Sequence, residues 1–285
     1  MNRLKALLVV LLVFCATSVP TTNEVTYYYY FPEVHSGVVG LAKGVALATA
    51  PQDRSVCDEV ALAGCNWWYS WSFWQYPCDN GVEYVSMIAD HKVAEFILDG
   101  TWILPFEPVH SEWIAFLNEP DLVEPTCTPE YAAELYRSLE PYLENYRIVT
   151  PAPSAPGVNW LQQFVNTYQS RYGELPRFDA LAVHCYANNY LTCKAHTKRM
   201  ISWATSWGID EVWVTEFSFV ELPPTLLFEA ISQEARQYIR WMRNEPMVTR
   251  CAWFTNRHQK QWGVGALFDY NTGELNAWGR LYRTE

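Results

Sequence analysis

The chain alternates between short apolar runs and longer stretches in which apolar residues recur every three or four positions. A short apolar run that ends at glycine, proline or a polar residue predicts a buried strand, and the longer spacing predicts an amphipathic helix. The predicted strands cover residues 43–47, 65–71, 83–88, 112–117, 147–150, 178–184, 212–216 and 249–254. The predicted helices cover residues 53–63, 91–99, 128–145, 159–172, 197–207, 226–244 and 275–282.

The residues at several helix ends support these limits. Thr128, Pro129 and Glu130 open one helix as N-cap, first-turn proline and first-turn acid. Gly64 and Gly208 follow the last residues of two others, as glycine often does at a helix C-terminus. Strands that alternate with helices form parallel sheets, and eight such units in about 250 residues predict an α/β fold, a single (β/α)8 TIM barrel.

Two of the predicted strands deliver a glutamate at their carboxyl ends. The run 113–117 leads into Asn-Glu-Pro-Asp, which contains Glu119, and the run 212–215 leads into Glu216. Because catalytic groups of this barrel lie at the carboxyl ends of the strands, the two glutamates are expected to face each other across its mouth. Paired carboxylates are the equipment of a glycoside hydrolase. The alternative is that Asn-Glu-Pro is a simple turn and Glu216 an ordinary strand residue on a hydrated face.

Residues 1–18 have the features of a secretory signal peptide. Arg3 and Lys5 precede Leu7–Phe14, an apolar stretch too short to span a bilayer. Small residues then suit cleavage after Ser18. An uncleaved anchor is the alternative. The signal predicts a secreted, extracellular protein.

The remaining chain is expected to form a short lead-in and one large domain. Residues 19–42 are predicted to pack on the barrel, and residues 43–285 to form the catalytic domain. The net charge of −11 disfavours nucleic acid as a partner, because nucleic acid needs a basic face. No stretch after the signal predicts a membrane span, and the mature protein is expected to be a monomer without a membrane partner.

Seven of the eight cysteines follow the signal segment, and an exported chain can oxidise them. Cys185 and Cys193 are the expected local disulfide because they flank one loop, while the other pairings stay open. No cysteine or histidine spacing matches a zinc site, so neither a metal nor a cofactor is expected. The scattered histidines expected at the surface are His35, His91, His110, His196 and His258.

Five segments carry a resemblance to a known family: Trp67–Trp71, Phe116–Asp121, Asp179–Tyr186, Val212–Phe217 and Arg250–Phe254. With these segments the chain resembles glycoside hydrolase family 128, the glycosyl hydrolase catalytic core barrels that act on β-1,3-glucan. The resemblance spans about residues 43–282, and the pairing of Asn-Glu-Pro-Asp with Thr-Glu-Phe is its most specific part.

The chain departs from the family pattern in two strands. Ser70 stands where the family usually has asparagine. Ser86 and Ala89 stand near positions that usually hold proline and tryptophan. These departures put the exact glucan and the cleavage mode in doubt.

The resemblance implies a retaining mechanism that uses two glutamates. Glu216 would attack the anomeric carbon, and Glu119 would act first as acid and then as base, from carboxyl groups about 5–5.5 Å apart. Apolar surroundings and the neighbouring negative charge are expected to raise the pKa of Glu119. Asn118 would bind the sugar 2-hydroxyl, although a turn residue is an equal alternative.

Further residues are expected to contact the sugar or the glutamates. His184 would orient Glu216 or a sugar, Tyr186 would donate to the nucleophile, and Trp253 would form the floor under the reacting sugar. Core packing is the alternative for the first two. Tyr69 and Trp71 are expected to reach the cleft, although alternation along a strand does not fix which face points inward.

The leading hypothesis is therefore a secreted retaining endo-β-1,3-glucanase that binds β-1,3-glucan polysaccharide or oligosaccharide and works by double displacement. One alternative keeps the chemistry and changes the substrate to another β-glycan. The other is a non-catalytic barrel that binds β-glucan oligosaccharides, and the presence of both glutamates argues against it.

Overall fold

The computed structural model describes residues 40–74, 78–104, 111–123, 127–154, 157–219, 228–258 and 265–285. The strands are β1 (Ala42–Ala46), β2 (Trp67–Tyr69), β3 (Glu83–Tyr84), β4 (Ser86–Ile88), β5 (Trp113–Phe116), β6 (Arg147–Val149), β7 (Ala180–Ala187), β8 (Glu211–Phe219) and β9 (Val248–Phe254). The α-helices are α1 (Val56–Leu62), α2 (His91–Leu98), α3 (Pro129–Leu139), α4 (Val158–Tyr172), α5 (Tyr190–Ser206), α6 (Phe228–Arg243) and α7 (Ala277–Thr284). Two 3-10 helices, η1 (Pro120–Val123) and η2 (Glu140–Tyr142), complete the described elements.

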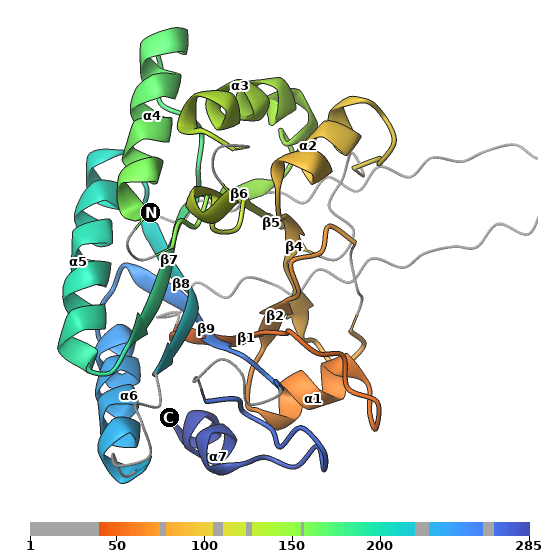
Figure 1. Ribbon diagram of the computed structural model, residues 1–285, viewed down its shortest axis with the longest axis vertical. Coiled ribbons are helices and arrows are strands. Elements are labelled where there is room, and N and C mark those ends of the chain that lie inside the picture. The colour runs from red at the N-terminus through yellow and green to blue at the C-terminus, as the bar shows by residue number, and fades with distance from the viewer. Residues whose placement is uncertain are drawn as a thin grey trace, which may run out of the picture. The chain divides into compact units, whose positions relative to one another are not determined.

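The strands form one parallel sheet that closes into a ring with the helices on its outside (Figure 1). The sheet runs β3-β2-β1-β9-β8-β7-β6-β5-β4, so β3 and β4 lie at its two formal edges. These two strands are consecutive in the chain and are separated only at Val85, whose N–H donates to the Trp68 carbonyl at 2.9 Å. They therefore act as one strand that closes the ring, and the predicted (β/α)8 barrel is confirmed.

The barrel interior is filled near its amino-terminal end by aromatic side chains. Trp67, Trp113 and Trp213 are each at most 2% exposed, and the Arg250 guanidinium lies 4.2 Å from the Trp213 ring. Glu83 pairs with Arg250 at 2.6 Å, so the partly buried cation has a counter-charge. These five side chains close the floor of the barrel and leave its carboxyl-terminal end for a site.

A glycine makes room for this floor. A Cβ at Gly44 would lie 2.4 Å from the Trp67 indole, closer than side-chain atoms approach. The sequence therefore places its smallest residue on β1 where its neighbour β2 turns its largest residue inward.

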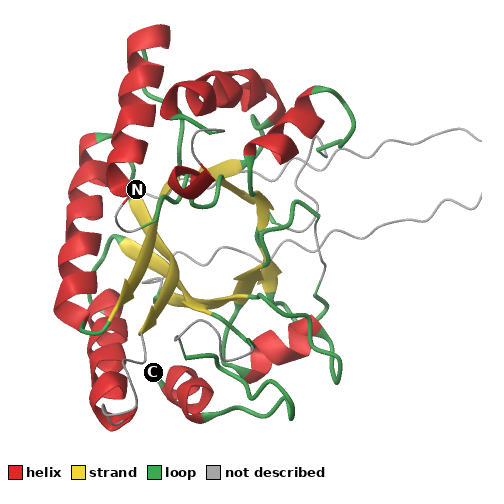
Figure 2. Ribbon diagram, viewed as in Figure 1, coloured by secondary structure: helices red, strands yellow, loops and turns green. Residues whose placement is uncertain are grey.

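The helices lie outside the ring of strands (Figure 2), and a second, larger hydrophobic layer lies between the strands and the helices. Strand residues alternate between the two layers. Trp67 and Tyr69 point into the barrel while Trp68 packs outward on Tyr84. Both faces of the sheet are therefore apolar, as expected for parallel strands covered by helices.

Several element limits differ from the prediction. β7 and β8 stay paired as far as Ala187 and Phe219, beyond the predicted ends of these strands. α5 begins at Tyr190 and not at residue 197, because the Asn189 side chain caps it by accepting from the Thr192 N–H at 2.9 Å.

Disulfides join Cys57 to Cys78 and Cys185 to Cys193, and the second confirms the predicted local pair. Cys65 and Cys251 are buried thiols. No helix within the described ranges is both long and apolar enough to cross a bilayer. The predicted signal, residues 1–18, and most of the lead-in, residues 19–42, lie outside the described part, so both stay predictions.

Candidate active site

Glu119 is presented by a tight turn directly after β5. Leu117 and Glu119 have φ values of 53° and 41°, in the left-handed region that non-glycine residues rarely adopt. The Glu119 N–H donates to the Ala152 carbonyl at 2.8 Å, which ties the turn to the loop after β6. Pro120 then starts η1. Strained backbone of this kind persists where the surroundings fix it and often marks a functional site.

Glu216 lies inside β8 and not at its end, which corrects the predicted position. The strand continues for three residues because its pairing with β7 extends to Phe219. The Glu216 side chain nevertheless reaches the mouth and is 3% exposed as a residue. Its Oε1 accepts from the Tyr69 hydroxyl at 2.9 Å and from the Trp71 Nε1–H at 3.2 Å.

The second oxygen of Glu216 accepts from the Tyr186 hydroxyl. Burial, followed by the negative charge of Glu216, raises the pKa of Tyr186 far above its usual range, and the same two causes raise the pKa of Tyr69. Both hydroxyls therefore stay protonated and remain donors. With the indole of Trp71 they fix both oxygens of one buried carboxylate.

His184 lies between the two glutamates. Its Nδ1 is 3.0 Å from Glu119 Oε1 and 3.7 Å from Glu216 Oε2. Burial alone would lower the pKa of His184, but the charge of Glu216 and the hydrogen bond and charge of Glu119 outweigh it, so the pKa is raised. A positive imidazolium is thereby favoured between two carboxylates.

One potential ligand atom from each of Glu119, His184 and Glu216 lies within 4.8 Å of the other two. Within the described ranges they are the one group of three such side chains close enough to hold a metal ion. The glutamates differ in access, because the Glu119 side chain is 24% exposed and that of Glu216 is 4% exposed. The site therefore contains one buried carboxylate held by hydrogen bonds, that of Glu216, and one accessible carboxyl group, that of Glu119. The protonated His184 lies next to both.

Trp71 links the two sides of the mouth. Its φ of 50° places it in the same left-handed region as Leu117 and Glu119, and its Nε1–H also lies 3.1 Å from Asn118 Oδ1. Tyr69 and Trp71 therefore both contact Glu216, on the inward face where they were expected. Contact of either residue, or of Asn118, with a sugar stays a prediction.

Trp253 does not reach the mouth, and its prediction as the floor of the sugar site is wrong. It is 0% exposed, donates from Nε1 to the Gly265 carbonyl at 2.6 Å, and packs on Trp278 of α7. The neighbouring Phe254 faces the mouth, with its ring 5.9 Å from that of Trp71.

A sequence signal for this parity was available in β9. Arg250 and Ala252 share the face of Phe254 and point into the barrel. A charge in either apolar layer needs a partner, and Arg250 has Glu83 on the inner side, so Arg250 marks the inner face of the strand. Counting in twos from Arg250 identifies Phe254 and excludes Trp253.

Asp121 ties down its loop, since it accepts from the Ser154 N–H at 2.8 Å and from the Ser154 hydroxyl. A Cβ at Gly157 would fall 1.9 Å from Asp121 Oδ2, so this position needs glycine. An open hollow of about 400 Å³ lies here, lined by Asp121, Leu122, Ser154, Gly157, Asn159, Trp160 and Gln163.

The histidines outside the site are less exposed than expected. His91, His196 and His258 are each partly buried, while His35 and His110 lie outside the described residues. Burial, the charge of Arg199 and that of His184 lower the pKa of His196 to about 4. The backbone of His184 acts in the opposite direction on the pKa of His196 and favours its charged form.

The family model of the glycosyl hydrolase catalytic core matches residues 44–282. The structure is similar to an endo-β-1,3-glucanase of family 128 (subgroup II) from Pseudomonas viridiflava, with 26% identity over 85% of this chain and 98% of that chain and a TM-score of 0.62. No curated protein matches the chain.

Two further solved structures have the same fold. A curdlan-specific exo-β-1,3-glucanase (subgroup III) from Blastomyces gilchristii, in complex with glucose, has 24% identity over 86% of this chain and 98% of that chain, with a TM-score of 0.62. A glutamate-to-alanine variant of an endo-β-1,3-glucanase (subgroup I) from Amycolatopsis mediterranei, in complex with laminaripentaose, has 20% identity over 86% and 99%, with a TM-score of 0.66. These findings confirm the resemblance drawn from the sequence.

Proposed function

The chain belongs to the glycosyl hydrolase catalytic core family, and we propose that it is a retaining endo-β-1,3-glucanase. The observation that carries the proposal is the pair Glu119 and Glu216, one accessible and one buried under three donors, bridged by His184. The substrate class comes from the similar structures, which include endo- and exo-acting β-1,3-glucanases.

Glu216 acts as the nucleophile. Its carboxylate attacks the anomeric carbon, the bond to the leaving oxygen breaks, and Glu119 gives that oxygen a proton. Glu119 then takes a proton from water, which attacks the glycosyl-enzyme and releases Glu216. Retaining enzymes hold these carboxyl groups about 5–5.5 Å apart and inverting ones about 6.5–9.5 Å apart. Ligand atoms within 4.8 Å of one another support retention.

The residues around the pair have separate tasks in this mechanism. Tyr69, Trp71 and Tyr186 fix the orientation of the Glu216 carboxylate. A bound sugar then meets the nucleophile already oriented for attack on its anomeric carbon. His184 supplies positive charge between the glutamates as the proton on Glu119 comes and goes. Asn118, whose Oδ1 is within reach of Trp71, offers its amide to the sugar 2-hydroxyl.

The hollow beside Asp121 offers space in which sugar units of the leaving group could bind. Asp121 follows Glu119 by two residues, and the acid must stand next to the leaving oxygen. A leaving group of several glucose units suits a polymeric substrate in either mode, and the endo mode is proposed from the similar endo-acting enzymes. Its test is the product profile on laminarihexaose, where release of glucose alone would indicate exo action.

The roles of the glutamates are tested by replacing each with alanine and adding azide. The Glu119→Ala variant is expected to form a β-glycosyl azide, because azide attacks the intermediate on the face that water uses. The Glu216→Ala variant is expected to give the α-azide, because azide takes the place of the nucleophile. Proton NMR of the first product formed by the unmodified protein is expected to show the β-anomer.

A substrate panel separates the alternatives. Turnover of laminarin or curdlan is expected. Turnover of another β-glycan alone would mean that the protein uses the same mechanism on that substrate and not on β-1,3-glucan. Binding of laminarihexaose without faster cleavage than the Glu216→Gln variant would indicate a non-catalytic barrel and refute the enzymatic role.

We also propose that the protein is exported and monomeric. Two disulfides suit an oxidising compartment. N-terminal sequencing of the mature protein is expected to begin at residue 19, and light scattering is expected to give the mass of one chain.

A further inference from the structure

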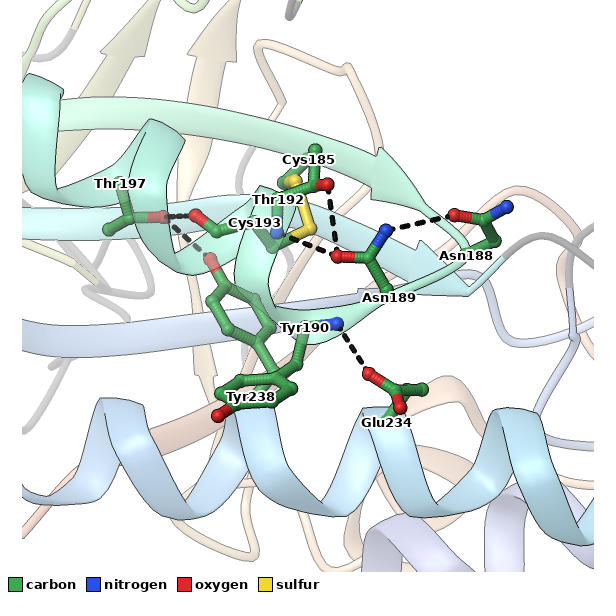
Figure 3. Close-up of a disulfide and its surroundings, with 9 residues drawn as sticks. All are labelled: Cys185, Asn188, Asn189, Tyr190, Thr192, Cys193, Thr197, Glu234 and Tyr238. Atoms are coloured by element: carbon green, nitrogen blue, oxygen red, sulfur yellow. Dashed lines mark hydrogen bonds between the residues drawn. A yellow bond between two sulfur atoms is a disulfide. The ribbon is translucent and has the colours of Figure 1, made fainter.

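Strand β7 presents three successive residues to two different environments. His184 and Tyr186 point into the mouth, where they contact Glu119 and Glu216. Cys185, between them, points outward and is bonded to Cys193 in the first turn of α5 (Figure 3). The disulfide is therefore attached to the backbone of the two residues that contact the proposed catalytic pair.

This end of β7 has little support from the sheet on one side. The ladder between β6 and β7 contains the pair Val149–Ala180, and the Thr150 hydroxyl extends it to the Ala182 N–H at 2.9 Å. On the other side β8 stays paired to Ala187, but the register shifts between Val183 and His184. Residues 184–186 are thus held by the sheet on the β8 side alone, and their other side depends on contacts from outside the sheet.

Helix α5 is a firm anchor for such contacts. Its first N–H, that of Tyr190, donates to Glu234 of α6 at 2.8 Å. The Thr197 hydroxyl lies 2.7 Å from that of Tyr238 on α6, and Figure 3 shows these groups around the bridge. His196, three residues after Cys193 and so on the same face of the helix, lies close enough to the His184 backbone for that backbone to act on its pKa. The helix therefore holds the end of β7 through the Cys185–Cys193 bridge, next to His184.

We propose that the Cys185–Cys193 disulfide is a positioning element for the catalytic pair, which keeps Tyr186 on Glu216 and His184 on Glu119. The proposal rests on the proposed function. Without the bridge, the end of β7 loses its bond to α5 and is held by β8 alone, so the Tyr186 donor shifts relative to Glu216. Small displacements of such groups cost turnover more than they cost folding.

The second disulfide provides a matched control. Cys57 and Cys78 are 21 residues apart and Cys185 and Cys193 are 8 apart, so the control bridge closes the longer loop and contributes at least as much to stability. Neither Cys57 nor Cys78 contacts the glutamates. A loss of activity that merely followed stability would therefore be at least as large in the control.

The experiment compares the double variants Cys185→Ala/Cys193→Ala and Cys57→Ala/Cys78→Ala on laminarihexaose. We expect kcat to fall roughly ten- to a hundredfold in the first, with KM within about twofold, and to stay unchanged in the control. In a Tyr186→Phe background, removal of the Cys185 bridge is expected to lower kcat by less than about twofold, because the contact that it protects is already gone. Full additivity in that background, or equal losses in both double variants, would overturn the proposal.

A readout without turnover keeps this test separate from the proposed function. NMR titration of the His184 imidazole is expected to show its pKa falling toward the ordinary value in the Cys185→Ala/Cys193→Ala variant, because the imidazole moves away from the two carboxylates. The control variant should keep the raised pKa. An unchanged His184 titration after loss of the bridge would refute the positioning role even if the wild type cleaved no glucan. Where the alanine variant does not fold, phosphine reduction of the folded protein serves as the perturbation.

Discussion

Replacement of Tyr186 by phenylalanine tests the hydrogen bonds that hold the proposed nucleophile. Tyr69 and Trp71 both donate to Oε1 of Glu216, so Oε2 depends on the Tyr186 hydroxyl. The next donor to Oε2, His184 Nδ1, is 3.7 Å away. A hydrogen bond to a charged group contributes about 1.5–3 kcal/mol. At about 1.4 kcal/mol for each factor of ten, kcat is expected to fall roughly 10- to 150-fold.

Steady-state kinetics on laminarihexaose provide the measurement, with KM expected to change by less than about twofold. The matched control is Tyr136→Phe, which removes a hydroxyl that donates to the Arg177 carbonyl in the outer layer. It should lower the melting temperature and leave kcat unchanged. Tyr69→Phe should cost less than Tyr186→Phe, because Trp71 remains on the same oxygen. A Tyr186→Phe enzyme with wild-type kcat would refute the reasoning.

Three further predictions address other parts of the site. Because the pKa of His184 is raised in the folded state, its charge stabilises the fold fully below about pH 6.5, and this stabilisation is lost as pH rises through the folded pKa. The difference in melting temperature between wild type and His184→Gln should therefore shrink as pH rises through the folded pKa. A difference that stays constant with pH would contradict this prediction. Gly157→Ala should destabilise by about 1–3 kcal/mol in denaturant unfolding, because its Cβ would clash with Asp121, and an unchanged midpoint would remove the steric argument. Phe254→Ala should raise KM, whereas Trp253→Phe should lower stability and spare KM; the opposite pattern would restore Trp253 to the cleft.

The strand and helix order could be read from the sequence because each apolar run is short and ends at a polar or glycine residue. The meeting of Glu119 with Glu216 followed from the same pattern, since parallel strands bring their carboxyl ends to one side. These predictions need only the alternation of elements and the known geometry of a closed parallel sheet.

The misplaced strand limits and the misplaced tryptophan have one physical cause. Both faces of these strands are buried, so hydrophobicity does not alternate and gives neither parity nor length. Trp253 and Phe254 are equally apolar, and only the charge of Arg250 distinguishes their faces. Likewise, the residues of β8 after Glu216 are buried on both faces, so they show no alternation of polar and apolar residues that would indicate a continuing strand.

The contacts around the glutamates depend on backbone conformations that local sequence does not reveal. Leu117, Glu119 and Trp71 adopt positive φ without being glycine. Such conformations are favoured only when the rest of the fold holds them, so a propensity argument predicts the opposite. The bridge from His184 to both carboxylates likewise needs the register shift between β7 and β8, where β8 has one extra residue, Thr215.

The tryptophans at the barrel floor give the molecule an internal optical reporter. The ring centres of Trp113 and Trp213 are 4.3 Å apart, and those of Trp67 and Trp213 are 5.5 Å apart. Indoles fixed at such separations in a chiral arrangement couple and produce near-ultraviolet circular dichroism, which disappears when tertiary packing loosens. Because this cluster lies at the end opposite the glutamates, its spectrum distinguishes a variant with an altered mouth from one whose barrel has opened.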